Sequence, residues 1–178
     1  MFTSGLKILT GQSVEVTYLA GPYADADPAI EQWRAARHAE AANIFVASGL
    51  HIFSPIVHGH GLLRYGELGD NLPVELRDGE YWMALDLMLM QACSQMYVLA
   101  LPGWHKSVGT EMEMFHADQQ GLETFVISYA TLCQIAERNC CPQPDWTQPT
   151  SGPRSEDPST CPSATSPQME RPPDESPL

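Results

Sequence analysis

The chain has 178 residues and a formal net charge of −13, from 22 acidic and 9 basic residues. An acidic body without a stripe of Lys and Arg argues against a surface that binds a nucleic-acid polymer, although backbone N–H groups and hydroxyls can still hold one small phosphate. Ten of the 15 prolines lie beyond residue 141, together with many Ser and Thr residues. Such a segment buries too little apolar surface to offset its ordering entropy. We therefore expect an N-terminal extension over 1–13, one folded domain over 14–138, and a disordered acidic tail over 139–178.

The five cysteines show neither the spacing of a zinc site nor that of a disulfide framework. No basic-then-apolar leader opens the chain, and no apolar run approaches the length of a membrane span. These features predict a cytoplasmic protein that does not associate with membranes.

Alternating β-branched runs and amphipathic, Ala-rich runs predict a series of strands and helices. The strands are expected at 14–20, 51–54, 95–101 and 123–128, and the helices at 28–48, 79–92, 109–120 and 131–138. Pro28 begins the first helix and Gly49 ends it. Residues 55–78 are rich in Gly and lack periodicity, which is typical of a binding loop or lid.

Strands that alternate with helices predict an α/β fold, a Rossmann/flavodoxin-like three-layer sandwich around a parallel sheet of four or five strands. Ligands of such sheets bind outside the carboxyl ends of the strands. Here those ends carry the polar, Gly-containing segments Ala20–Tyr23, Ser54–His60 and Pro102–Ser107. We expect the binding site to lie where these three segments meet.

The third of these segments leads into a helix that carries acids in its first turns. Ser107 is placed to cap this helix, whose free N–H groups and dipole favour an anion such as a phosphate. Gly109 and Glu113 lie about 40° apart on one helical face, so Gly109 leaves room over the Glu113 carboxylate, whereas Glu111 points into solvent. Glu113 is the candidate nucleophile. The alternative is an ordinary capped helix with acids in its first turns.

Other candidates lie at the end of the first strand and within the 79–92 helix. Gly21, Pro22 and Tyr23 bring backbone close to a ligand, or serve only to end the strand. Asp86 interrupts an apolar helix, where an unpaired carboxylate is costly to bury, so it is a candidate functional acid or an acid at the edge of the apolar stripe. Trp82, on the same helix, could stack on a nucleobase or pack in the core.

His58 and His60 form an HxH pair in the 55–78 segment, without a third ligand at a recognisable spacing. We expect no metal there. The two histidines are candidate contacts to a base or a phosphate, or ordinary loop residues.

In order and spacing, these motifs resemble the nucleoside 2-deoxyribosyltransferase superfamily, which includes the 2′-deoxynucleoside 5′-phosphate N-hydrolases. They are most similar to its bacterial and phage DUF1937 branch. The resemblance covers about residues 14–128 and rests on the segments Tyr18–Tyr23, Gly49–His60, Tyr81–Asp86 and Gly103–Glu113.

The resemblance implies cleavage of an N-glycosidic bond without a cofactor. Glu113 would attack the anomeric carbon, Ser107 would contact phosphate or sugar, and Tyr18 and Asp86 would match the superfamily's strand tyrosine and helix acid. The phosphate-binding hydrolases carry Ser and Arg in the first loop where this chain has Pro22 and Ala24, which leaves the 5′-phosphate open. The resemblance also implies a homodimer or larger homo-oligomer.

We expect a covalent glycosyl-enzyme at Glu113, resolved by water or by a second base, with Asp86 as proton donor or acceptor and Tyr18 holding Glu113. Two alternatives remain at this point. One is a non-catalytic nucleotide-binding module of the same fold. The other is a metal-dependent hydrolase that uses the two histidines.

Overall fold

The structure is a computed structural model that describes residues 6–7, 13–64 and 79–149. Its central sheet is parallel, with strand order β4-β3-β5-β6. The strands are β3 (Val16–Ala20), β4 (His51–Phe53), β5 (Gln95–Leu99) and β6 (Glu123–Ile127). This is the order of a Rossmann/flavodoxin-like sheet, whose switch point lies between β3 and β5. The predicted fold class is confirmed, and the central sheet has four strands among the described residues.

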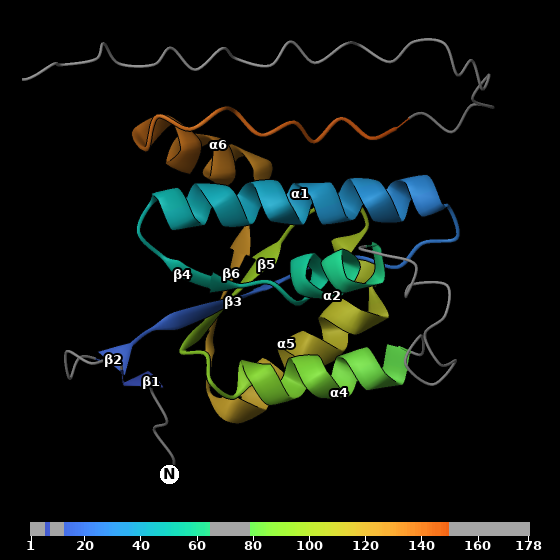
Figure 1. The fold of residues 1–178 in the computed structure, drawn as a ribbon, viewed down its shortest axis with the longest axis vertical. Helices are drawn as coiled ribbons and strands as arrows, with labels where there is room; N and C mark the ends of the chain where they lie inside the picture. Colours follow the sequence, from blue (N-terminus) through green and yellow to red (C-terminus); the bar gives the residue numbers. More distant parts are fainter. Residues whose placement is uncertain (1–5, 8–12, 65–78, 150–178) are drawn as a thin grey trace, which may run out of the picture.

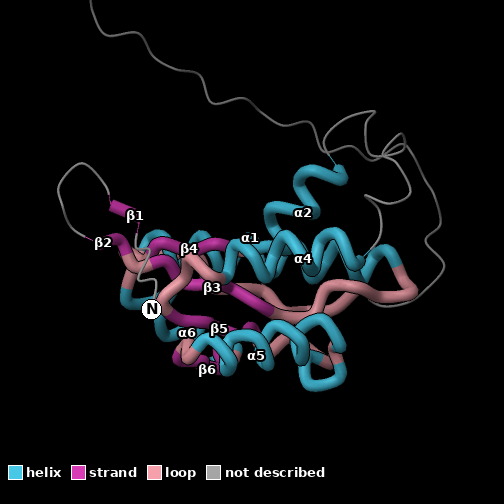
Figure 2. Tube along the Cα trace, turned by 90° about the horizontal axis from the view of Figure 1, so that it is seen from below, coloured by secondary structure: helices cyan, strands magenta, loops and turns pink. Residues whose placement is uncertain are grey.

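Helices cover both faces of this sheet (Figure 1). They are α1 (Pro28–Ala47), α2 (Pro55–Arg64), α4 (Gly79–Met90), α5 (Val108–Gln120) and α6 (Tyr129–Arg138), with a short 3-10 turn, η2 (Trp104–Lys106), before α5. Figure 1 shows α1 and α6 above the strands and α4 and α5 below them, and Figure 2 looks onto the sheet from the α4–α5 side. Among these helices none is both long and apolar enough to cross a bilayer.

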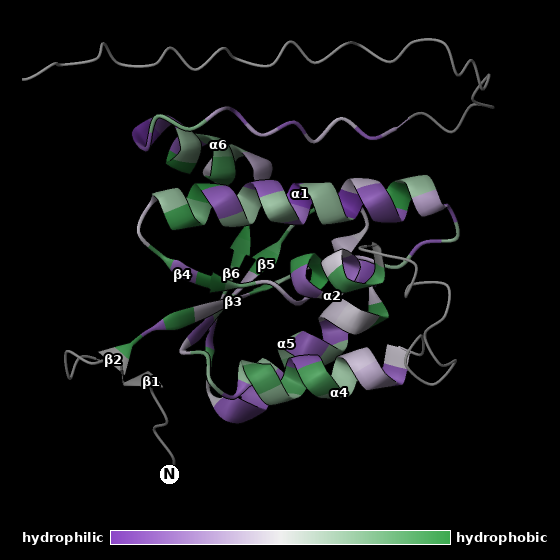
Figure 3. Ribbon diagram, in the orientation of Figure 1, coloured by the Kyte–Doolittle hydropathy of each residue, from purple (hydrophilic) through white to green (hydrophobic). Residues whose placement is uncertain are grey.

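The two faces of the sheet have separate apolar cores because neighbouring residues of a strand point to opposite sides. Leu19 and Leu99 pack against α1 and α6, in a cluster that includes Phe45 and Leu132. The other face packs against α4 and α5, through a cluster that contains Tyr18, Ala20, Met90, Met96, Val98 and Ala117. Figure 3 shows the strands mostly in the hydrophobic colour. Side chains that alternate along β3 therefore belong to different cores.

Side-chain caps fix where the helices begin, much as the sequence predicts. The Asp27 carboxylate accepts a hydrogen bond from the backbone N–H of Ala29 at 2.9 Å, at the start of α1. The Ser107 hydroxyl accepts one from the N–H of Thr110 at 3.4 Å, which confirms Ser107 as the cap of α5. Gly49 follows α1 with φ 89°, a left-handed conformation that glycine adopts without strain.

The expected loop over 55–78 is wrong for its first part, because residues 55–64 form α2. Two glycines make this segment a poor helix by propensity, yet α2 packs against α1 and β3. Gly59 lies against α4: a Cβ at this position would be 3.4 Å from the Trp82 ring, an ordinary contact. Packing therefore overrides local preference. The remaining residues, 65–78, lie outside the described residues.

Two further differences lie at the ends of the domain. Leu6–Lys7 (β1) and Ser13–Val14 (β2) form a small antiparallel pair before the main sheet, so the first predicted strand is divided. Residues 142–149, which we expected within the disordered tail, pack against α1 and α6 and are called the strap below. The Tyr129 hydroxyl donates to the Pro144 carbonyl at 2.8 Å, and the Tyr129 and Trp146 rings lie 5.2 Å apart. Residues 150–178 lie outside the described residues.

Candidate active site

The strongest cluster of functional groups lies between β3, α4 and α5. Tyr18 points from β3 toward α5, and its hydroxyl donates a 2.7 Å hydrogen bond to the Glu113 carboxylate. Both side chains are buried, and Glu113 is only 6% exposed. Thr110, Glu113 and Ala117 form the buried side of α5, as their three- and four-residue spacing requires. Glu111 is exposed, as predicted.

Burial shifts the proton affinity of these groups. It raises the pKa of Glu113 to about 8, helped by the negative charge of Asp86 and opposed by the hydrogen bond from Tyr18. Burial also raises the pKa of Asp86, to about 6. The pKa of Tyr18 is raised too, first by burial and then by the Glu113 charge. The phenol therefore stays protonated and acts as a donor, while the two carboxyl groups compete for charge.

This arrangement can perform acid–base or nucleophilic chemistry on a bound molecule. Glu113 is buried and Asp86 half-buried, and the two interact electrostatically. Carboxyl groups with perturbed pKa values that interact in this way are typical of catalytic sites, where one group must be charged and the other protonated. Both Glu113 and Asp86 lie on helices that begin at the carboxyl edge of the sheet, the edge where ligands of this fold bind. The three residues to which we assigned catalytic roles are thus within interaction range of one another.

A second group of predicted residues lies at the carboxyl edge itself. The Tyr23 hydroxyl and His60 Nδ1 are 2.9 Å apart, which joins the loop after β3 to α2. His58 is exposed, and its ring centroid lies 6.2 Å from that of Phe53, which in turn neighbours Tyr18 at 5.8 Å. Aromatic rings therefore connect α2 to the strand that carries Tyr18.

The remaining predicted residues lie at contacts between elements. Trp82 packs on Gly59 of α2 and edge-on against Tyr81. Gly109 faces α4: a Cβ there would meet the methyl group of Met83 at 3.8 Å, an ordinary contact, and it does not lie over Glu113 as we expected. Pro22 is buried just after β3.

Gly21 is held to glycine by a buried histidine of α1. A Cβ at Gly21 would lie 2.7 Å from His38 Nε2. His38 of α1 is fully buried, neither ring nitrogen has a hydrogen-bond partner among the described residues, and burial lowers its pKa to about 3. The imidazole is therefore neutral and packs directly beneath the backbone at the end of β3.

Sequence reasoning missed Arg34, which organises the loop after β3. Its guanidinium donates to the carbonyls of Tyr23 and Ala24 at 3.2 and 2.6 Å and pairs with Asp25 at 3.1 Å. It also lies 3.8 Å from where a Cβ on Gly103 would be, in the loop after β5. No local signal distinguishes Arg34 from the other charged residues of α1, which are Glu31, Arg37 and Glu40.

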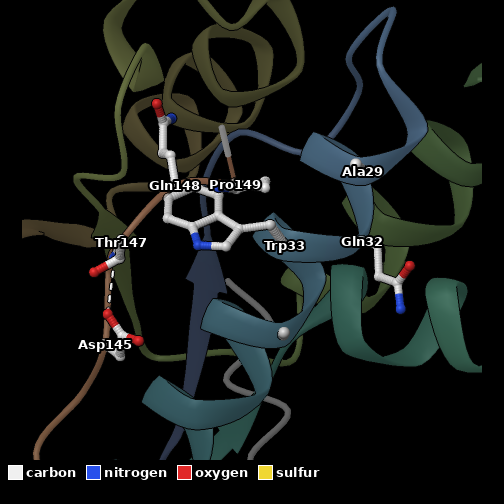
Figure 4. A pocket seen from close by; sticks show the side chains of 8 residues that line it. Ala29, Gln32, Trp33, Asp145, Thr147, Gln148 and Pro149 are labelled. Atoms are coloured by element: carbon white, nitrogen blue, oxygen red, sulfur yellow. Dashed lines mark hydrogen bonds between the residues drawn. The ribbon is translucent and has the colours of Figure 1, made fainter. Parts of the chain in front are cut away.

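Two other observations concern small molecules and metals. A shallow hollow of about 580 Å³ lies between the first half of α1 and the strap, with the Trp33 ring in its wall (Figure 4). It is on the α1 side of the sheet, away from Glu113. Among the described residues, no three His, Cys, Asp or Glu side chains gather as metal ligands. Cys93, Cys133, Cys140 and Cys141 are free thiols.

Comparison with known proteins adds one match. The model of a family described as "Domain of unknown function (DUF1937)" matches residues 15–129. The match spans β3 to the first residue of α6, and therefore includes Tyr18, Asp86 and Glu113 but not the strap. No curated protein matches the chain.

Proposed function

The chain belongs to the DUF1937 family, and we propose that it cleaves the N-glycosidic bond of (deoxy)nucleosides or nucleoside 5′-monophosphates with Glu113 as the nucleophile. By this proposal the family is a branch of the nucleoside 2-deoxyribosyltransferase superfamily. The observation that carries the proposal is the buried Glu113 carboxylate, held by the Tyr18 hydroxyl at 2.7 Å beside a second perturbed acid, Asp86. We further propose that the protein acts as a cytoplasmic homo-oligomer.

The first step breaks the glycosidic bond. One Glu113 oxygen attacks C1′ of the pentose as the bond from C1′ to the base nitrogen breaks, through a transition state with oxocarbenium character. The bond's electron pair leaves on the base, which takes a proton from the Asp86 carboxyl group. The Tyr18 hydroxyl holds the attacking carboxylate in one orientation, which favours attack over rotation of the side chain.

The second step releases the sugar. Water attacks C1′ and gives its proton to the Asp86 carboxylate, while the bond from C1′ to the Glu113 oxygen breaks and its electron pair returns to Glu113. This restores both acids to their starting forms and yields the free pentose or its 5-phosphate. If a second base reaches C1′ before water does, the same intermediate gives base exchange. Hydrolase and transferase activities thus share one mechanism and differ in what enters the site.

The protonation states give this mechanism a specific pH signature. The reactive form has Glu113 charged and Asp86 protonated, although the pKa of Glu113, about 8, lies above that of Asp86, about 6. The free enzyme therefore holds the reactive form as a minor species, at roughly one part in a hundred. We expect a bell-shaped profile of kcat/KM, with apparent pKa values of the pair near these two values.

The test is a chromatographic assay of base released from deoxynucleosides and their 5′-monophosphates, with and without an acceptor base. Glu113→Gln should abolish release, whereas Glu111→Gln, an exposed acid on the same helix, should leave it unchanged. Mass spectrometry of the acid-quenched wild type should find a glycosyl adduct on Glu113. Retention of most of the rate by the Glu113→Gln variant would refute the assignment.

The alternatives give different results in the same experiment. A nucleotide-binding module binds these compounds in calorimetry and releases no base over long incubation. A metal-dependent hydrolase loses activity with a chelator, whereas the proposed mechanism is insensitive to it.

A further inference from the structure

The hollow between α1 and the strap is separate from the residues that the proposed chemistry uses. It lies on the α1 side of the sheet, and the strap that forms one of its walls is outside the part of the chain that the family model matches. Its volume of about 580 Å³ is within the range of small-molecule sites, roughly 300–1,000 Å³. The hollow is therefore large enough to hold a ligand of its own.

Trp33 brings an unused hydrogen-bond donor to this hollow. The residue is only 9% exposed, and its indole N–H has no acceptor among the described residues. The indole N–H is the only polar group of a tryptophan side chain, and leaving such a donor buried without a partner destabilises the protein. Figure 4 shows the nitrogen on the edge of the ring that faces Thr147 of the strap. A molecule bound between α1 and the strap can therefore supply the missing acceptor.

The second half of the strap, residues 147–149, is the wall that can open. The first half is tied to the rest of the protein by hydrogen bonds of the Pro144 and Asp145 backbone. In the second half, the Thr147 N–H donates to the Asp145 carboxylate at 2.9 Å, within the strap itself, and in the described part of the chain no hydrogen bond joins residues 147–149 to α1. Solvent does not reach the Trp33 nitrogen in this arrangement. An outward shift of residues 147–149 opens the way to it.

The other side chains of the hollow determine which kind of molecule fits. Asp145 is the charged residue among those that line it, and hydrogen bonding to Thr147 lowers its pKa, so it is a charged acceptor at neutral pH. The nearby Arg37 is paired with Glu40 at 3.5 Å, so the hollow disfavours an anion. Most of the other lining residues are small and apolar or carry amides: Ala29, Ala36, Pro149, Gln32 and Gln148. A ligand that matches this lining has an apolar body, one acceptor for Trp33 and one donor for Asp145.

We propose that the hollow between α1 and the strap binds an uncharged, planar heterocycle that carries a lactam group. The lactam carbonyl accepts a hydrogen bond from the Trp33 N–H, and the adjacent lactam N–H donates to the Asp145 carboxylate. A shallow hollow covers one face and one edge of a flat ring, which contacts Pro149 and the two alanines of α1. Residues 147–149 shift outward as the ligand enters and then pack against it.

The test is isothermal titration calorimetry of the full chain with two ligands that differ only in the lactam group. 2-Quinolone carries it, and quinoline has the same two fused rings without it. The wild type should bind 2-quinolone about tenfold more tightly than quinoline, which has no N–H to donate to Asp145. Trp33→Phe keeps an aromatic ring and removes the indole donor, so it should weaken the binding of 2-quinolone about tenfold.

A pair of surface variants tests the location without disturbing the core. Ala36→Leu fills the hollow from the exposed side of α1 and should abolish the binding of both ligands. Ala47→Leu is the matched control, because Ala47 is also exposed but ends the same helix; it should leave the dissociation constants unchanged. Glu113→Gln should bind 2-quinolone as the wild type does, since Glu113 lies on the other face of the sheet.

Folding of the variants is checked by circular dichroism. Four results would overturn the proposal: no binding of 2-quinolone at millimolar concentration, equal affinities for the two ligands, equal effects of the Ala36 and Ala47 variants, or loss of binding in the Glu113→Gln variant, which would place the ligand at the candidate active site. Because calorimetry of these ligands requires no turnover, its outcome does not depend on the proposed chemistry. A protein that binds 2-quinolone in this way but releases no base would leave this inference standing and remove the proposed function.

Discussion

Burial of the Glu113 carboxyl group predicts that the wild type becomes less stable as pH rises, and that Glu113→Gln removes the part of this dependence that Glu113 causes and leaves the part that Asp86 causes below about pH 6. The folded protein holds the Glu113 proton up to about pH 8, whereas the ordinary pKa is 4.5. Between these two values the folded state binds more protons than the unfolded state, so the free energy of unfolding falls as pH increases. Each pH unit in this window costs about 1.4 kcal/mol. Stability that is fully present below the ordinary pKa is therefore lost as pH rises toward 8.

The size of this effect is the difference in the free energy of unfolding between the wild type and the Glu113→Gln variant. Glutamine is neutral at every pH, and its side-chain oxygen can still accept the hydrogen bond from Tyr18. At pH 7 the Glu113→Gln variant should be more stable than the wild type by about 3 kcal/mol, and by more at higher pH, while the two should be nearly equal near the ordinary pKa. Under the proposed function, the carboxylate is retained at this cost to stability because the reaction needs it.

The assay is urea denaturation followed by circular dichroism at a series of pH values, with Glu111→Gln as control. Glu111 is exposed on the same helix, so its variant should follow the wild-type curve. Parallel pH dependences for the wild type and the Glu113→Gln variant would refute the reasoning. The Glu113 proton would then not be held by the folded structure.

Three further predictions test individual contacts. Tyr18→Phe removes the hydrogen bond that lowers the pKa of Glu113, so kcat should fall and the alkaline limb of the pH profile of kcat/KM, which reports Glu113, should move to higher pH. An alkaline limb at the same pH in both proteins would count against this contact. Gly21→Ala should destabilise the protein by about 2 kcal/mol in urea, because its Cβ would meet the His38 ring, and a second change, His38→Ala, should restore part of the loss. Trp146→Ala should cost about 2 kcal/mol by removing a half-buried ring from the α1–α6 side, with base release unaffected; an unchanged denaturation midpoint would show that the strap contributes nothing.

Much of the fold could be predicted because its signals are local. Pro28, Ser107 and Gly49 mark helix ends through caps and backbone conformations that depend on a few neighbouring residues. The alternation of strands and helices then restricts the topology to a parallel, doubly wound sheet. The helix over 55–64 was missed since its stability comes from α1, β3 and Trp82, which are distant in sequence.

The candidate site also contains some features that local sequence signals predict and others that depend on tertiary packing. Helical periodicity could separate Glu113 from the solvent-facing Glu111, whereas Tyr18 entered as a candidate only through the resemblance. That the two meet at 2.7 Å depends on how α5 packs on the sheet, and the resemblance to a family supplied this pairing where periodicity could not. The contacts of Arg34 with the loop after β3, and of His38 with Gly21, depend wholly on tertiary packing. A single sequence carries no local signal for them.

The separation of the two cores by the sheet has a consequence for how such a protein can change over time. The stability that is lost by burying the Glu113 carboxyl group in the α4–α5 layer can be restored by better packing in the α1–α6 layer, on the other face of the sheet. Substitutions in one layer leave the other layer's side chains in place, because adjacent strand residues point in opposite directions. Substitutions around Glu113 could thus alter the proposed site during evolution, while substitutions in the α1–α6 layer restore the stability of the fold. The strap, which carries Trp146, belongs to this second layer.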